Sequence, residues 1–409
     1  MAIINDVSLG FEREPLIAPL GFKGGYVNNL WQIAVLIKDD LGREGLGLGL
    51  QSVLWSDSSV FTAFTTTGGN SAMLMITEYA LKLLRGQLLR NPIEMLLDIL
   101  PDVHEYGKQV TGFANMKMTF TLNALVAVDM ALWRLYCNSF DEILPNSERQ
   151  NKLASIPTIA YGLSGDQIKQ LADDGMFFMK IKIGNNPEWD MERISQIHDI
   201  FRDRSTEYTD NGKIPYYIDA NCRYNSKESL LRLIDHADKI GALQQIVLFE
   251  EPFPEELEID VSDIPLRLVA DESAHSVEDC KRLIDMGYSS FALKPIAKTL
   301  SMSLLVLEKA YAAGLHCFCA DLTVNPLMVD WNKNLAARLG LLSGVKVGFI
   351  ETNGHQNYKN WERMVLQHPA NKASWIRENN GLFELNDDFY QESGGIFQEA
   401  PHYRELALS

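Results

Sequence analysis

Two different hydrophobic patterns divide the chain near residue 150. The first part opens with two β-rich runs, and the second of these, at 30–49, surrounds the turn sequence Asp39-Asp40-Leu41-Gly42, which predicts a β-hairpin. Residues 55–71 are rich in Ser, Thr and Gly, and the pair Gly68-Gly69 predicts a loop there. Apolar positions at helical spacing then predict helices at about 72–90, 92–107 and 119–137. Residues 1–150 are therefore expected to form an α+β domain.

From about residue 155, short apolar runs alternate with amphipathic stretches. The runs of strand length are Thr158–Tyr161, Phe177–Ile183, Tyr216–Ala220, Ile246–Phe249, Arg267–Ala270, Phe291–Leu293, Cys317–Ala320 and Val345–Ile350. Eight strands joined by seven crossovers predict an α/β fold with a (β/α)₈ TIM-type barrel over residues 151–367. An open doubly wound sheet also alternates, but it rarely contains eight consecutive units. Residues 368–409 lack this period and are expected to pack back on the N-terminal domain.

Composition excludes several classes of protein. The 409 residues carry 37 Lys and Arg against 54 Asp and Glu, and a net charge of −17 argues against a nucleic-acid partner. Five cysteines, an odd number without a CxxC pair, favour a reducing compartment. The N-terminus has no secretory signal pattern, and no apolar run reaches the roughly 18 residues of a membrane span. A cytoplasmic protein without a membrane partner is expected, and the sequence leaves homo-oligomerisation open.

Carboxylates follow three successive predicted strands, at Asp219, Glu250 and Asp271. Strand ends meet at the C-terminal face of a barrel, where active sites lie. Three converging oxygen ligands without a neighbouring His suit Mg²⁺ or Mn²⁺ better than Zn²⁺. Each carboxylate could instead cap a helix N-terminus, but three in succession favour a shared cation.

Three lysines are expected to face these carboxylates. Lys180 and Lys182 are two residues apart on the second strand, so their ammonium groups point the same way, and Lys294 ends the sixth strand across the barrel mouth. A lone lysine at a strand end is usually a solvated surface charge. Crowded cations lower one another's pKa, which would make one of these lysines a usable base.

Together the motifs Lys-x-Lys, Asp-x-Asn, Glu-Glu-Pro, Asp-Glu-Ser and the strand-six Lys resemble the enolase superfamily, and within it the muconate lactonizing enzyme subgroup, which includes dipeptide epimerases. The resemblance covers nearly the whole chain and implies an N-terminal α+β capping domain completed by the C-terminal tail. It implies that Asp219, Glu250 and Asp271 bind Mg²⁺, with Asn221 and Glu272 beside them. It also implies that Lys182 and Lys294 act as bases on opposite faces of the substrate, and that Lys180 holds a carboxylate.

The sequence departs from the subgroup at two places that contact substrate. The usual Gly-Gly after the strand-six lysine is replaced by residues 295–299, Pro-Ile-Ala-Lys-Thr. Dipeptide epimerases bind the substrate ammonium with Asp-x-Asp on strand eight, where this chain has Glu351-Thr352-Asn353. Substrate contacts are expected from Asp321, Thr323, Glu351, Asn353, Trp55 and Asp57.

The reaction predicted by this set is Mg²⁺-dependent removal of a proton α to a carboxylate, giving an enediolate. A racemase or epimerase of a small-molecule carboxylate, such as a dipeptide or an amino-acid derivative, is the first hypothesis. An acid-sugar dehydratase or a cycloisomerase is the second. A Schiff-base aldolase using Lys182 or Lys294 is a more distant alternative, because isolated barrel lysines also perform that chemistry, and a non-catalytic binding protein is the last.

Overall fold

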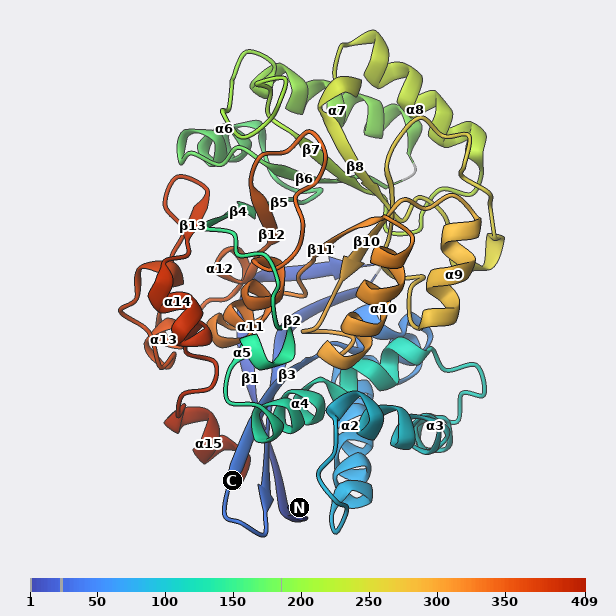
Figure 1. Cartoon of the computed structure of the whole chain (residues 1–409). Helices are drawn as coiled ribbons and strands as arrows, with labels where there is room; N and C mark the ends of the chain where they lie inside the picture. The colour runs from blue at the N-terminus through green and yellow to red at the C-terminus, as the bar shows by residue number, and fades with distance from the viewer. Residues whose placement is uncertain (1, 23–24, 185) are drawn as a thin grey trace.

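The computed structural model describes residues 2–22, 25–184 and 186–409. Its N-terminal part is a three-stranded antiparallel sheet of β1 (Ile4–Phe22), β2 (Gly25–Asp39) and β3 (Glu44–Gln51) (Figure 1). Strands β2 and β3 pair from Trp31↔Gln51 to Lys38↔Glu44, which confirms the predicted hairpin and its turn. The helices α2 (Ser58–Leu84) and α4 (Met118–Tyr136) pack on this sheet, and α3 (Pro92–Thr111) packs on α2 and α4.

The predicted loop at 55–71 was wrong, because most of it is helical. A short helix α1 (Val53–Ser56) precedes α2, and Asp57 caps α2 by accepting hydrogen bonds from the backbone N–H groups of Ser59 and Val60. Thr65 alone has non-helical dihedrals within α2. Gly69 serves close packing instead of a turn, because a Cβ there would lie 2.4 Å from Val53 Cγ2.

Helix α4 is the central helix of the N-terminal domain. Its length and its mean hydropathy of 1.2 would suit a membrane span, but 89% of that window is buried inside the protein. Gly45 and Gly47 of β3 let the strand approach it, since a Cβ on either glycine would lie about 2 Å from an α4 carbonyl oxygen. The apolar character of α4 is therefore explained by its position in the core.

The larger sheet forms the predicted barrel. Its parallel strands are β4 (Lys152–Ile156), β5 (Thr158–Ile159), β6 (Met179–Lys182), β7 (Tyr216–Asp219), β8 (Ile246–Glu250), β9 (Leu268–Ala270), β10 (Ser290–Leu293), β11 (His316–Cys319) and β12 (Gly348–Glu351). Segments β4 and β5 are separated only by Pro157, and β4 pairs with β12 while β5 pairs with β6. This interrupted strand therefore connects the two edges of the curled sheet, and the (β/α)₈ prediction is confirmed.

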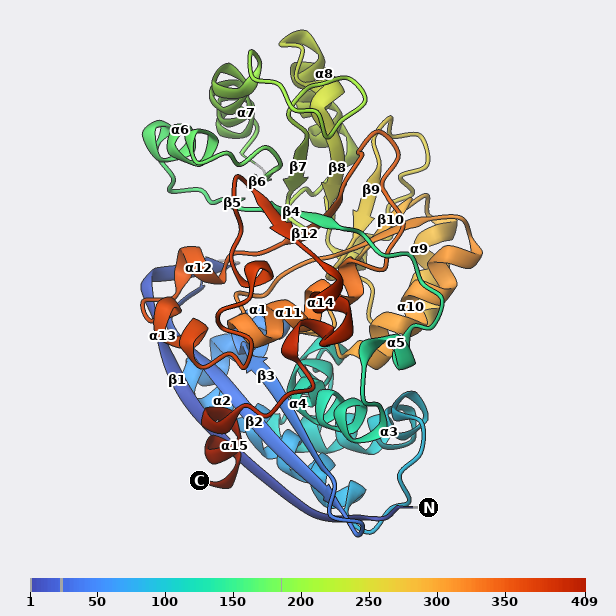
Figure 2. The same ribbon diagram turned by 60° about the vertical axis from the view of Figure 1, so that its left-hand side comes forward.

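Helices on the outside of the barrel connect its strands (Figures 1 and 2). They are α6 (Gly165–Asp173), α7 (Pro187–Phe201), α8 (Lys227–Lys239), α9 (Val277–Asp285), α10 (Leu300–Ala312) and α11 (Pro326–Ala336). The β8–β9 connection, described throughout, contains only the 3₁₀ turn η2 (Glu255–Leu257). Smaller elements are α5 (Phe140–Ile143) after α4 and η1 (Leu243–Gln245) before β8.

The C-terminal tail divides between the two parts of the molecule. Strand β13 (Leu382–Glu384) pairs antiparallel with β4. It is preceded in sequence by α12 (Gly354–Asn357), α13 (Trp361–Leu366) and η3 (Ser374–Ile376), and followed by α14 (Asp387–Gln391) and η4 (Ser393–Gly395). The last helix, α15 (Pro401–Leu408), lies along β1 and β2, as Figure 2 shows. Helix α15 thus packs on the N-terminal sheet, the α12–α13 region also contacts β1 through Arg363 and Glu14, and β13 extends the barrel sheet. The exact domain limits stay a prediction.

Candidate active site

The C-terminal ends of the barrel strands surround a cavity of about 220 Å³, which apolar side chains of the N-terminal part help to close. Trp55 and Leu54 come from α1, and Leu20, Val27 and Leu30 from the β1–β2 region. The predicted site residues that line the cavity are Lys180, Lys182, Asp219, Asn221, Glu250, Glu272, Lys294, Asp321, Thr323, Glu351, Asn353 and Trp55. Asp271 is buried beside the cavity and Asp57 lies elsewhere.

The predicted metal-binding carboxylates do not form one group. Asp219 and Glu250 are Cα partners on adjacent strands β7 and β8. Carboxylate oxygens of Glu250, Asp271 and Glu272 lie within 4.8 Å of one another, whereas Asp219 Oδ2 is contacted by two lysines. Glu272 was expected only beside the metal ligands, but it forms a carboxylate cluster with Glu250 and Asp271.

Lys180 is held by carboxylates from three strands. Its Nζ lies 2.9 Å from Asp219 Oδ2, 3.1 Å from Glu250 Oε2 and 2.9 Å from Glu351 Oε2. The same ammonium lies 4.5 Å from the centre of the Tyr217 ring on β7. Burial alone would lower the pKa of Lys180, but the three carboxylates outweigh it and raise that pKa well above its ordinary value.

Lys182 and Lys294 approach the carboxylates from different strands, β6 and β10. Lys182 Nζ donates to Asp219 Oδ2 at 2.5 Å and to Asn221 Oδ1 at 3.1 Å, and Lys294 Nζ contacts Asp271 Oδ2. Three strands, β7 to β9, separate the two lysines in the sheet order. Both lysines thus border the cavity with the carboxylate cluster between them.

The expectation that crowding leaves a lysine with a lowered pKa was wrong for Lys180 and Lys294, although the charge of Lys180 does lower the pKa of Lys294. Burial favours neutral Lys294, but the carboxylates of Asp271, Glu272 and Glu250 outweigh it and raise its pKa. Burial raises the pKa of Glu250 to about 8, and the negative charge of Asp271 adds to this rise, because several buried anions lie close together. The spacing of the lysines in the sequence does not reveal how many carboxylates face them in the folded protein.

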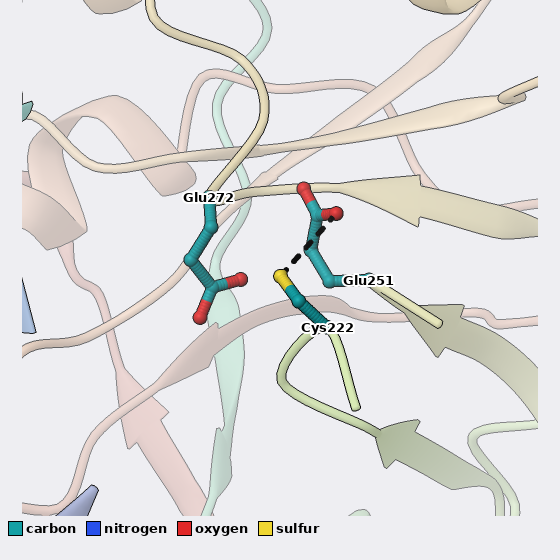
Figure 3. Close-up of side chains that lie close together, drawn as sticks. All are labelled: Cys222, Glu251 and Glu272. Carbon is teal, nitrogen blue, oxygen red and sulfur yellow. Dashed lines mark hydrogen bonds between the residues drawn. The ribbon is translucent and has the colours of Figure 1, made fainter. Parts of the chain in front are cut away.

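A second glutamate of the Glu-Glu-Pro motif organises the carboxylate cluster. Glu251 Oε1 accepts hydrogen bonds from the backbone N–H of Asp271 at 2.6 Å and from the N–H and Oγ of Ser273, at 2.9 and 2.6 Å. Figure 3 shows Glu251 beside Cys222, whose Sγ lies 4.0 Å from Glu251 Oε2, and opposite Glu272. Glu251 thereby fixes the segment that carries Asp271 and Glu272. Sequence analysis missed this role, although the doubled glutamate was visible.

Lys298 is a buried cation that sequence analysis also missed. It belongs to the segment that replaces the usual Gly-Gly, and its Nζ donates to the carbonyl oxygens of Asp271 and Ala274 and lies 3.5 Å from Asp271 Oδ1. The lysine therefore braces the backbone around Asp271 and approaches its Oδ1, whereas Lys294 contacts its Oδ2. The unusual sequence at 295–299 was a signal for it.

The two candidates from the region of α1 differ in position. The Trp55 ring lies in the cavity wall, with its centre 4.8 Å from Lys294 Nζ. Asp57 is buried, and its second carboxylate oxygen accepts from the backbone N–H of Lys117 at 2.9 Å, while the first caps α2. The structure therefore gives Asp57 a structural role, and we do not retain it as a substrate contact.

The ends of β11 and β12 form a hydrogen-bonded wall. Asp321 Oδ2 accepts from the Asn353 backbone N–H at 2.7 Å, and the Thr323 hydroxyl donates to Asn353 Oδ1 at 2.6 Å. Burial raises the pKa of Asp321 to about 7, and the charge of Glu351 adds to this rise. Glu351 forms an ion pair with Lys180, so its carboxylate is not free to bind a substrate ammonium.

The carboxylate cluster fits a divalent cation. Glu250 Oε1 and Glu272 Oε2 are buried and accept no hydrogen bond from any residue that the structure describes. Buried, unpaired carboxylate oxygens are unfavourable, and hard oxygen donors are the ligands of Mg²⁺. The set of donors in the cluster therefore matches the predicted metal.

Comparisons with known proteins identify the family of this chain. The enolase C-terminal domain-like family model matches residues 164–371, just over half of the chain. A curated L-Ala-D/L-Glu epimerase of Clostridium acetobutylicum is 24% identical, with 84% of this chain and 89% of that protein covered. Among solved structures, a mandelate racemase/muconate lactonizing protein from Herpetosiphon aurantiacus matches with a TM-score of 0.69, 21% identity and coverage of 94% and 96% of the two chains.

A dipeptide epimerase from Cytophaga hutchinsonii, complexed with Mg and the dipeptide D-Ala-L-Val, matches with a TM-score of 0.66, 18% identity and coverage of 86% of this chain and 88% of that one. The fold, the order of the strand-end motifs and the family model agree. The chain belongs to the enolase superfamily, within its mandelate racemase and muconate lactonizing enzyme family.

Proposed function

We propose that this chain is a Mg²⁺-dependent epimerase that removes and returns the proton α to a substrate carboxylate. The observation that carries the proposal is the pair Lys182 and Lys294, which reach one cavity from β6 and β10 with a carboxylate cluster between them. Two bases on opposite faces of one carbon suit inversion, because one removes the proton and the other supplies it. The curated relative named as an L-Ala-D/L-Glu epimerase supports the same chemistry.

Asp219, Glu250 and Asp271 would hold the Mg²⁺: Glu250 and Asp271 belong to the cluster with Glu272, a further oxygen donor, and Asp219 lies next to Glu250 on the adjacent strand. A bound Mg²⁺ stabilises the negative charge that develops on a carboxylate when its α-proton leaves. The relative that was solved with Mg and a dipeptide supports this choice of metal. Exchange of Mg²⁺ for Mn²⁺, a cytoplasmic location and homo-oligomerisation stay predictions from the sequence.

The chain's own residues would divide the proton transfer between them. Lys182, whose ammonium is held by Asp219 and Asn221, would act on one face of the α-carbon, and Lys294 on the other. Lys180 would remain charged and attract the substrate carboxylate, because three carboxylates keep its proton in place. Trp55 and the apolar groups above the cavity would exclude water from the reacting carbon.

The substrate class is a small carboxylate, either a dipeptide or another amino-acid derivative. Glu351 is paired with Lys180, so Asp321 is the carboxylate of the β11–β12 wall that could accept a hydrogen bond from a substrate ammonium. The Schiff-base hypothesis, which would use Lys182 or Lys294, is less well supported, because the relatives named above are epimerases and a mandelate racemase/muconate lactonizing protein.

The proposal is tested by proton exchange in D₂O. We expect the protein with Mg²⁺ to place deuterium on the α-carbon next to the carboxylate of dipeptides such as L-Ala-L-Glu, and to form the opposite stereoisomer, as followed by ¹H NMR and chiral chromatography. EDTA should stop the exchange and added Mg²⁺ should restore it. Absence of exchange across a panel of dipeptides and N-acyl amino acids would contradict the proposal. Borohydride inactivation in the presence of a carbonyl substrate would indicate the aldolase instead.

A further inference from the structure

Arg223 is a cation of the cavity wall without a carboxylate partner among the residues that the structure describes. The other cations of the lining, Lys180, Lys182 and Lys294, each contact a carboxylate. No described Asp or Glu lies within ion-pair distance of Arg223, and the residues outside the described ranges, at positions 1, 23–24 and 185, are not acidic. A half-buried guanidinium in a cavity is unfavourable without an anion, so Arg223 is placed to receive one from a ligand.

The backbone that carries Arg223 is fixed on both sides. The chain turns sharply after β7, with positive φ at Asn221 (45°) and Cys222 (59°). The Cys222 backbone N–H donates to the Glu251 carbonyl at 2.7 Å, and the Tyr224 N–H donates to the Pro252 carbonyl at 2.8 Å. The buried Tyr224 hydroxyl also donates to Asp190 at 2.9 Å. Arg223 therefore starts from a rigid position, which lowers the entropic cost of binding through it.

The side chain of Arg223 rests on an aromatic platform. Its guanidinium carbon lies 4.9 Å from the centre of the Tyr161 ring, which also lines the cavity. The Tyr161 hydroxyl donates to the Ile183 carbonyl at 2.8 Å, and its ring packs against Trp189 with centroids 5.7 Å apart. Stacking on a ring uses the face of a guanidinium and leaves its N–H edge for a carboxylate, which it binds in a fork geometry.

We propose that Arg223 binds a second carboxylate of the substrate, remote from the carboxylate at the reacting carbon. The proposed substrate class is therefore an acidic one, such as a dipeptide whose epimerised residue has a carboxylate side chain. This inference rests on the proposed function and adds a specificity residue to it. Arg223 lies in the same wall as Tyr161, on the β5–β7 side of the cavity, whereas Asp321 and Asn353 form the β11–β12 side.

The test compares two dipeptides that differ only in this charge, L-Ala-L-Glu and L-Ala-L-Gln. For the unmodified protein we expect kcat/KM to be about 10- to 100-fold higher for the acidic dipeptide, the range for a hydrogen-bonded charge pair. In Arg223→Met that ratio should fall toward one, mainly through KM for L-Ala-L-Glu. Arg223→Lys, which keeps the charge but loses the fork, should lie between them. Arg232→Met, which removes an exposed arginine of α8, is the matched control and should keep the ratio.

A ratio near one in the unmodified protein, a preference for L-Ala-L-Lys, or an unchanged ratio in Arg223→Met would overturn the inference. A binding measurement separates it from the proposed function. With Mg²⁺ present, calorimetry should show that glutarate binds at least 10-fold more tightly than its monoamide, and that Arg223→Met removes this difference. If no dipeptide exchanges its α-proton, the proposed function fails, and glutarate binding alone then decides the role of Arg223.

Discussion

At the scale of single residues, Lys180 limits which groups can perform proton transfer. Its side chain is 2% exposed and its ammonium contacts carboxylates of β7, β8 and β12. A buried charge with three close partners is strongly destabilised when it loses its proton, because the partners would then be unpaired. Lys182 is the more exposed lysine of the pair on β6, at 19%, and has fewer partners. Proton transfer on that side of the cavity is therefore assigned to Lys182.

The metal assignment makes a prediction about individual carboxylates. Asp219→Asn, Glu250→Gln and Asp271→Asn should each weaken Mg²⁺ binding by at least about 10-fold in calorimetric titration, since each removes one negative oxygen donor. Glu272→Gln keeps its Oε1 as an acceptor for Asn221, which now donates to it at 3.2 Å, and should have a smaller effect. Circular dichroism should show an intact fold. A variant with the original Mg²⁺ affinity would remove its residue from the ligand set.

At the scale of elements, α4 and α10 join the N-terminal domain to the barrel. Asp129 of α4 is buried and accepts hydrogen bonds from the backbone N–H groups of Leu300, at 2.8 Å, and Ser301, at 3.1 Å, at the start of α10. Its neighbour Trp133 donates from Nε1 to Ser301 Oγ at 3.0 Å. A carboxylate from one domain thus caps a helix of the other, where the partial positive charge of a helix N-terminus favours an anion.

Asp129 should make the stability of the protein depend on pH. Burial raises its pKa from 3.8 to about 6, so the folded state binds a proton more tightly than the unfolded state does. The free energy of unfolding therefore falls as the pH rises through this window, by about 3 kcal/mol in total and about 1 kcal/mol between pH 5 and 7. The free energy of unfolding of Asp129→Asn, measured with urea at a series of pH values, should not show this decrease.

The exposed Asp203→Asn is the control for this measurement, because its side chain is 92% exposed and its removal should leave the slope unchanged. Identical pH slopes for Asp129→Asn and the unmodified protein between pH 5 and 7 would contradict burial as the dominant influence on Asp129.

At the scale of the whole molecule, the C-terminal tail fastens the N-terminal sheet. Tyr403 of α15 is 1% exposed where this helix crosses β1 and β2. Tyr403→Ala should lower the free energy of unfolding by about 3 kcal/mol, the usual cost of removing a large buried ring. Leu408→Ala, at a position 52% exposed in the same helix, should change it little. Equal effects of the two substitutions in urea unfolding would show that α15 does not hold the sheet.

Sequence patterns predicted the barrel because each parallel strand is a short apolar run that ends in a polar residue. They failed at 58–71, where Ser, Thr and Gly form the first half of α2 because Asp57 caps it and Gly69 permits contact with Val53. They identified the cavity residues, since residues at strand ends meet in any such barrel. Sequence patterns could not predict which side chains pair. The ion pair of Lys180 with Glu351, and the lack of a carboxylate beside Arg223 among the described residues, depend on distances between strands that are far apart in sequence.

The two-base mechanism is tested by asking whether Lys182 and Lys294 act on opposite faces of one carbon. Each stereoisomer of an epimerised dipeptide is incubated in D₂O with Mg²⁺, and α-deuteration is followed by ¹H NMR for Lys182→Ala, Lys294→Ala and the exposed control Lys239→Ala. Both site variants should lose epimerisation, and each should still exchange the α-proton of the one stereoisomer that faces its remaining lysine. The control should behave as the unmodified protein does. Normal epimerisation by Lys294→Ala, or loss of exchange with the same stereoisomer in both site variants, would contradict the two-base account.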